Sequence, residues 1–108
     1  MQMYSGNSIV FSGQAFLDGG LQNPANLSNY TGLTFYILDQ VTGATYNAMS
    51  TVNFANGASG SFTVTYNQGI LTQKGSYYTT LVGSIPTSTI QNTFYLGSNN
   101  RYPYLEID

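Results

Sequence analysis

The chain has 108 residues, a net charge of −2 and two basic residues, Lys74 and Arg101, while histidine, cysteine and tryptophan are absent. Without His or Cys there is no Ser-His-Asp or Cys-His nucleophile, no disulfide and no ordinary zinc site. Two cations cannot neutralise the row of phosphates that nucleic-acid affinity requires, and they give no anchor on anionic lipid. We therefore expect a protein without cofactor or metal that binds neither nucleic acid nor membrane.

Strand-forming residues and closely spaced turns run through the whole chain. No window carries apolar residues at the i, i+3, i+4, i+7 spacing of an amphipathic helix. Short runs of Tyr, Phe, Thr, Val and Ile alternate with turn residues, which is typical of all-β domains. The pattern predicts an immunoglobulin-like antiparallel β-sandwich of seven or eight short strands, with a small barrel or jelly roll as the alternative. We assign residues 8–108 to this single domain and residues 1–7 to an N-terminal arm.

The first predicted strand covers residues 8–17, and Gly13 within it marks a bulge or bend where the strand changes sheets. Asp18-Gly19-Gly20 ends this strand. Residues 21–31 read as an ordered loop, in which Leu27 is the apolar residue expected to close the end of the sandwich.

The clearest strand signal lies at residues 33–39. Leu33, Phe35 and Ile37 fall on one face, and the opposite face is semi-apolar, which suits a central strand. A hairpin turn follows, with Gly43 available for positive φ, and residues 44–47 form a short return strand. A further strand is expected at residues 50–54.

The second half of the chain continues the same alternation, with Phe62, Val64 and Tyr66 on one face of residues 60–66. Residues 60–66 and 77–85 are predicted strands, and the second of them ends before Pro86, which has no N–H to donate. Residues 89–96 and 102–107 form the final pair of strands, joined by a turn at residues 97–100.

Tyr77, two residues after Gly75, has two readings. Its hydroxyl ties the preceding loop to nearby backbone, as in a tyrosine corner, or its ring simply packs in the core. Both roles are structural.

The carboxylates give no convincing active site. Asp18 and Asp39 fall in predicted turns, where aspartate is common because its side chain accepts hydrogen bonds from the following backbone. Glu106 and Asp108 share a strand face, and no spacing resembles a calcium loop or the paired carboxyls of a glycosidase. We therefore expect a protein that is not an enzyme.

Ten tyrosines exceed what one small core can enclose, so some of them must be exposed. Exposed tyrosine offers a large contact area at a low cost in side-chain entropy, which suits protein contacts, and it also suits sugar stacking. The residues expected to contact other proteins are Met1, Met3, Tyr4, Tyr102 and Tyr104. For the arm we weigh two readings, docking on a neighbouring subunit by strand addition and a frayed terminus.

Four segments resemble small immunoglobulin-like domains of phage virions. They are the lead-in Asn-Leu-Ser-Asn-Tyr-Thr-Gly at residues 26–32, Asp39 with Thr42-Gly43, Gly75-Ser76-Tyr77, and the closing Tyr-Leu-Glu-Ile at residues 104–107. Together they make residues 8–107 similar to the N-terminal domain of phage baseplate upper proteins and to short virion proteins built on that module. The resemblance implies a structural role in assembly and no catalytic residues.

The expected function is that of a bacteriophage virion structural protein. We favour a head decoration or cement subunit that binds neighbouring capsid subunits, as a homo-oligomer or in many copies on a symmetric particle. A tail or baseplate component and a host-glycan-binding attachment module are the alternatives. The low charge agrees with assembly. A chain with so few lysines leaves its sheet edges unprotected against association, unless other subunits of an assembly cover them.

Overall fold

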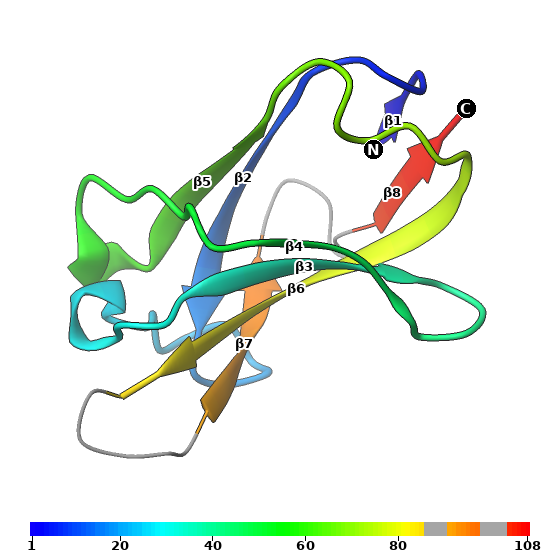
Figure 1. Cartoon of the computed structure of the whole chain (residues 1–108). Coiled ribbons are helices and arrows are strands. Elements are labelled where there is room, and N and C mark those ends of the chain that lie inside the picture. Colours follow the sequence, from blue (N-terminus) through cyan, green and yellow to red (C-terminus); the bar gives the residue numbers. More distant parts are fainter. Residues whose placement is uncertain (86–90, 98–103) are drawn as a thin grey trace.

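The computed structural model describes residues 1–85, 91–97 and 104–108. Over these residues it contains eight strands and two single-turn 3-10 helices, which confirms the predicted all-β, sandwich-like class (Figure 1). The strands are β1 (Gln2–Met3), β2 (Ile9–Phe16), β3 (Thr34–Asp39), β4 (Thr45–Met49), β5 (Ser61–Tyr66), β6 (Gly75–Ser84), β7 (Gln91–Gly97) and β8 (Tyr104–Ile107), and the 3-10 helices are η1 (Leu27–Asn29) and η2 (Gly57–Ser59).

The longest strand, β6, organises the pairing. One side of β6 pairs with β3, and β4 lies beyond β3. The other side pairs with β8 over the first half of β6 and with β7 over its last four residues. Because β7 also pairs with β2, and β2 with β5, the sheet curls over and its two ends face each other (Figure 1).

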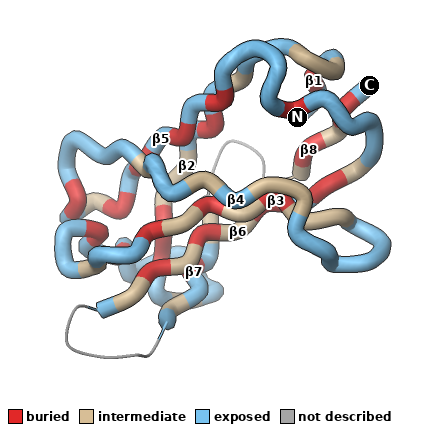
Figure 2. The backbone as a smooth tube through the Cα atoms, viewed as in Figure 1, coloured by how far each residue is buried: buried red, intermediate tan, exposed pale blue. Residues whose placement is uncertain are grey.

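The core lies between these facing layers, where alternate residues of the strands are buried (Figure 2). Its centre is aromatic: the ring of Phe11 lies 5.1 Å from that of Phe35 and 5.8 Å from that of Tyr66. The predicted inward positions in residues 33–39 and 60–66 are confirmed, and Leu27 of η1 is fully buried as expected. The remaining buried hydrophobic residues include Phe62, Val64, Leu71, Tyr77, Leu81, Phe94, Leu105 and Ile107.

The tyrosine corner is present. The Tyr77 hydroxyl donates a 2.9 Å hydrogen bond to the Gln73 carbonyl oxygen, while its ring is buried. Tyr46 of β4 stacks on Tyr77 with ring centroids 4.9 Å apart, and its hydroxyl accepts hydrogen bonds from the backbone N–H groups of Thr72 and Gln73, each 2.9 Å long. Two tyrosines from different strands thus fix the loop that enters β6.

Two predictions about local strand structure were wrong. Residues 50–54 do not form a strand, and only Asn53 makes a bridge, to Thr63 of β5. This segment has too few apolar side chains to bury a face against the core. Gly13 marks no bulge, since β2 pairs with β5 in unbroken register from Ile9 to Gln14. The strand that joins the two layers is β7.

The N-terminal segment also differs from the expected free arm. Gln2 and Met3 form β1, which pairs in parallel with β8 of the same chain, whereas the other strand pairs of the described residues are antiparallel. Met3 is buried because its side chain enters the core beside β8. The strand predicted at residues 77–85 ends at Ser84, before Pro86 as expected. The beginnings predicted at Thr89 and Tyr102, and most of the turn at residues 97–100, lie outside the described residues.

Gly60 and Gly69 separate backbone strain from close packing. Both have positive φ, +75° at Gly60 and +88° at Gly69, but a Cβ at Gly60 would overlap the Ala15 carbonyl oxygen, whereas a Cβ at Gly69 meets nothing within 4 Å. We expect Gly69→Ala to lower the free energy of unfolding by about 1 kcal/mol, the cost of the left-handed conformation, and Gly60→Ala to lower it by clearly more. Urea unfolding of both variants checks this, and equal losses would contradict the close approach.

Tyr77 and Tyr66 give a second matched pair. The Tyr66 hydroxyl is buried and has no hydrogen-bond partner among the described residues, and burial raises the pKa of Tyr66. We expect Tyr77→Phe to lower the free energy of unfolding by about 1 kcal/mol, because it removes the bond to Gln73. Tyr66→Phe removes an unsatisfied polar group, so it will leave stability unchanged or raise it. The two variants are compared in one urea titration.

Candidate protein-interaction face

The face of β3, β6 and β8 that points away from the core carries a row of aromatic and aliphatic side chains. Residues directly opposite each other on paired strands point to the same face, and Leu38, Tyr78 and Tyr104 lie opposite one another across β3, β6 and β8. Tyr36 and Val82 occupy further positions of the same outer register, opposite Thr80 and Thr34. We call Tyr36, Leu38, Tyr78, Val82 and Tyr104 the tyrosine face.

The members of the tyrosine face are partly exposed, whereas residues that alternate with them along the strands, such as Ile37, Tyr77 and Leu105, are buried. Tyr78 is the most open of them, with 39% of its surface exposed. The Tyr104 hydroxyl donates a 3.2 Å hydrogen bond to Ser76 Oγ, which orients its ring across the sheet. The five side chains carry no charge, and Glu106, whose Oε2 accepts a 3.4 Å hydrogen bond from Gln2 Nε2, lies at the rim.

The β3–β4 hairpin borders the tyrosine face and is held by Asp39. Its carboxylate accepts hydrogen bonds from the backbone N–H groups of Val41 at 2.9 Å and Thr42 at 3.0 Å. These bonds, from Thr42 first and then Val41, hold the pKa of Asp39 below its usual range. Gly43 takes the predicted positive φ of +73°. At the tip, Val41 is 92% exposed and extends the uncharged surface.

The predicted interface residues differ in their exposure and location. Tyr104 lies on the tyrosine face, Met1 and Tyr4 are exposed beside β1, and Met3 is buried, so Met3 offers no free surface in this fold. Tyr102 lies outside the described residues. The N-terminal residues and Tyr104 lie in the same part of the sheet, because β1 pairs with β8 and Tyr104 is the first residue of β8.

Sequence reasoning did not select Tyr36 and Tyr78 as interface residues. The signal for them was present: residues 33–39 and 77–85 each have a second, semi-apolar face that alternates with the core face. What the sequence does not contain is the register, which sets Leu38 beside Tyr78 and Tyr78 beside Tyr104. Only this register makes one continuous surface from residues on three strands.

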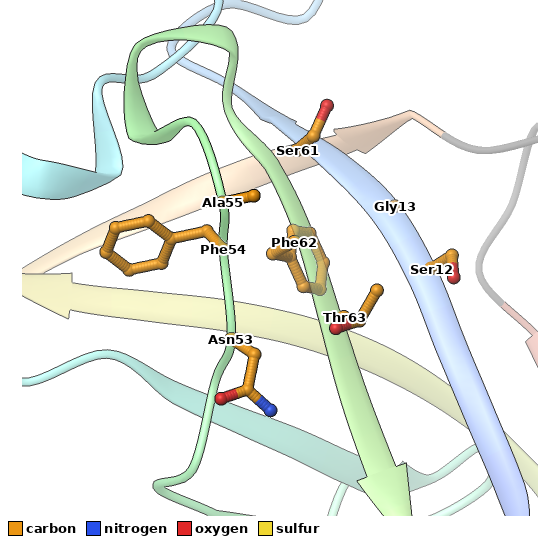
Figure 3. Close-up of a pocket in the computed structure, with 8 residues that line it drawn as sticks. All are labelled: Ser12, Gly13, Asn53, Phe54, Ala55, Ser61, Phe62 and Thr63. Atoms are coloured by element: carbon orange, nitrogen blue, oxygen red, sulfur yellow. The ribbon is translucent and has the colours of Figure 1, made fainter.

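A second feature is a shallow groove of about 660 Å³ along β2 and β5. Its lining is uncharged and consists of Ser12, Gly13, Asn53, Phe54, Ala55, Ser61, Phe62 and Thr63. Figure 3 shows these side chains fanning out, with the Phe54 ring extending away from Ser12 and Thr63. The groove therefore has hydroxyl and amide groups but no point on which they converge.

Comparisons of the chain with protein-family models, with curated proteins and with solved structures found no match. Within residues 1–85, 91–97 and 104–108, no cluster of three or more His, Cys, Asp or Glu side chains is placed to hold a metal ion. Over the same ranges, no helix has the length and apolar character needed to cross a membrane. The tyrosine face is the feature from which we argue function.

The hairpin beside the tyrosine face will lose stability in acid. Because the pKa of Asp39 is lower in the folded chain than its ordinary value of 3.8, the ionised carboxylate stabilises the fold above that pH, and the stabilisation is lost as the pH falls through the folded value. Asp39→Asn keeps an acceptor oxygen but has no charge to lose. We expect the variant to lose less stability than the parent chain between about pH 6 and pH 2, measured by urea unfolding. Equal losses would contradict this assignment.

Proposed function

We propose that this protein is a non-catalytic structural subunit of a bacteriophage virion that binds neighbouring virion proteins through the tyrosine face. The observation that carries the proposal is the alignment of Leu38, Tyr78 and Tyr104 on the uncharged outside of three paired strands. A face of this kind costs free energy when it stays in water, and it gains from contact with another protein.

The chemistry of the tyrosine face suits a protein partner. Tyrosine rings bury a large area with little loss of side-chain freedom, and their hydroxyl groups keep a hydrogen bond at the edge of a contact. Because the face has no charged member, its contacts change little with salt concentration. That property is useful on a particle that meets varied conditions outside a cell.

The assignment to a virion rests on the resemblance of residues 26–43, 75–77 and 104–107 to immunoglobulin-like phage domains. Among virion roles we favour head decoration, in which a small domain binds many equivalent sites on a symmetric capsid. The partners are then capsid subunits, and the protein is present as a homo-oligomer or in many copies. A tail or baseplate position is the alternative within the same class.

Host-glycan attachment is the second candidate. It is favoured by the uncharged groove along β2 and β5, where Ser12, Asn53 and Thr63 provide hydrogen-bonding groups for neutral sugar hydroxyls. We rank it below assembly because the lining side chains diverge (Figure 3). A glycan array separates the two: this candidate requires a signal that Asn53→Ala abolishes, and a blank array would remove it.

The assembly proposal is tested by co-sedimentation of purified protein with phage heads and, separately, with tails that lack it. We expect Tyr36→Ser/Tyr78→Ser to weaken binding by about tenfold or more, since aromatic residues dominate the binding energy of protein contacts. The control is Val10→Ser, which removes an open apolar side chain, 53% exposed, from β2. Circular dichroism confirms that both variants fold.

Each result decides a part of the proposal. Binding to heads but not tails supports decoration, and the reverse supports a tail position. Absence of binding to both particles contradicts the virion role. Equal effects of the control and the face variant would show that binding does not use the tyrosine face.

A further inference from the structure

We propose that the outer edge of β8 is an acceptor site for the N-terminal strand of a second copy of this chain. In this exchange, residues 1–4 of each copy leave their own β8 and pair with the β8 of a neighbour. The inference deepens the proposed multi-copy assembly and rests on it, although it is testable with the purified protein alone.

The fit of this strand to β8 is already present within one chain. Gln2 pairs with Glu106 and Met3 with Ile107 in parallel register. The N–H groups of Glu106 and Asp108 donate to the carbonyl oxygens of Met1 and Met3 at 3.0 Å and 2.9 Å. Nearly all of the pairing is made by backbone groups, which an identical segment from another copy reproduces without change.

Met3 adds a side-chain anchor to this backbone pairing. Its side chain is buried in the core cluster that also contains Leu105 and Ile107 of β8. A strand that leaves the edge therefore opens an apolar site, and the Met3 of an exchanging partner is the side chain that fits it. The occupant of the β8 edge is thus specified by both backbone register and shape.

The segment after β1 connects the exchanging strand to the rest of the domain. It crosses from the β8 edge to β2, which lies in the other layer (Figure 1). Gly6 has a φ of +85° and is held in place, because its N–H donates to the Leu71 carbonyl oxygen at 2.8 Å and its own carbonyl accepts from the Gly69 N–H at 2.9 Å. Ser5 is held as well, because its N–H donates to the Asp108 carbonyl oxygen at 2.9 Å and its Oγ donates to the Thr72 carbonyl oxygen at 2.6 Å. Exchange therefore has to break the bond to Asp108, and the pivot lies at Tyr4.

The pivot limits where the neighbour can be. Four extended residues span about 14 Å, so the β8 edge of the second copy must lie within that distance of Gly6. Tyr4, at the pivot itself, is 71% exposed in the single chain. Two copies that exchange strands bring their Tyr4 residues together, so that each Tyr4 ring packs against the other copy and becomes less exposed.

Exchange is favoured where copies are crowded. Residues 1–3 make the same hydrogen bonds to β8 in the closed and exchanged forms, and Met3 is buried in both. The two forms therefore differ mainly at Tyr4 and Ser5 and in the entropy of association. On a particle that holds neighbouring copies side by side, the local concentration is about millimolar, and that entropy cost is small.

The test uses the absence of cysteine from the sequence. The variants Gln2→Cys and Glu106→Cys place single thiols at register partners on the outside of β1 and β8. The two proteins are mixed at about 1 mM, unfolded, refolded together and oxidised, and disulfide-linked dimers are identified by mass spectrometry. The background is given by Gln2→Cys mixed with Thr63→Cys, whose thiol lies on the exposed side of β5.

We expect the dimer that links the Gln2→Cys copy to the Glu106→Cys copy to exceed the background dimer by about tenfold, because only the first pair of thiols is held in register. The double variant Gln2→Cys/Glu106→Cys will give covalent dimers as well as intrachain links. No excess over background, with intrachain links alone in the double variant, would overturn the exchange. That result leaves particle binding by the tyrosine face untouched, so the two proposals fail separately.

Discussion

The fold depends on the pairing of β6. This strand pairs with β3 along one side and with β8 and β7 along the other, so it connects every part of the curled sheet. Its residues alternate between the two sides of the sheet: Tyr77 and Leu81 point into the core, while Tyr78 and Val82 point outward. The same strand therefore carries the stability of the protein and the centre of its candidate interaction face.

With so few charges, the chain secures its loops through bonds from side chains to backbone. Asp18 accepts from the N–H groups of Gln22 and Asn23, and Asp39 does the same at the β3–β4 hairpin. Asn26 and Asn56 cap η1 and η2 in the same way. Turns that are held by side-chain bonds to the backbone do not depend on ion pairs, so the surface can carry few charges.

The two proposed contacts use neighbouring parts of the molecule and different physics. The tyrosine face offers apolar area across β3, β6 and β8, whereas the β8 edge offers backbone hydrogen bonds and a site for Met3. Tyr104 belongs to the first and lies two residues from Glu106, which belongs to the second. A subunit with adjacent contacts of both kinds can join a copy of itself and still present a face to a different protein.

Much of the local structure could be predicted from the sequence. The inward faces at residues 33–39 and 60–66, the hairpin at Gly43 and the hydroxyl bond of Tyr77 depend on alternation and turn chemistry within a few residues. The failed strand at residues 50–54 shows the limit of this reasoning, because β-propensity without an apolar face does not hold a segment in a sheet. The sequence alone therefore determined the all-β class, most strand positions and the low charge of the chain, since these follow from composition and short-range periodicity.

Tertiary structure decided which strands lie side by side. The register across β3, β6 and β8 gathered Tyr36, Tyr78 and Tyr104 into one face, and long-range pairing placed Met3 on its own β8. Pairing between distant segments depends on how the whole core closes, and no local pattern contains that information.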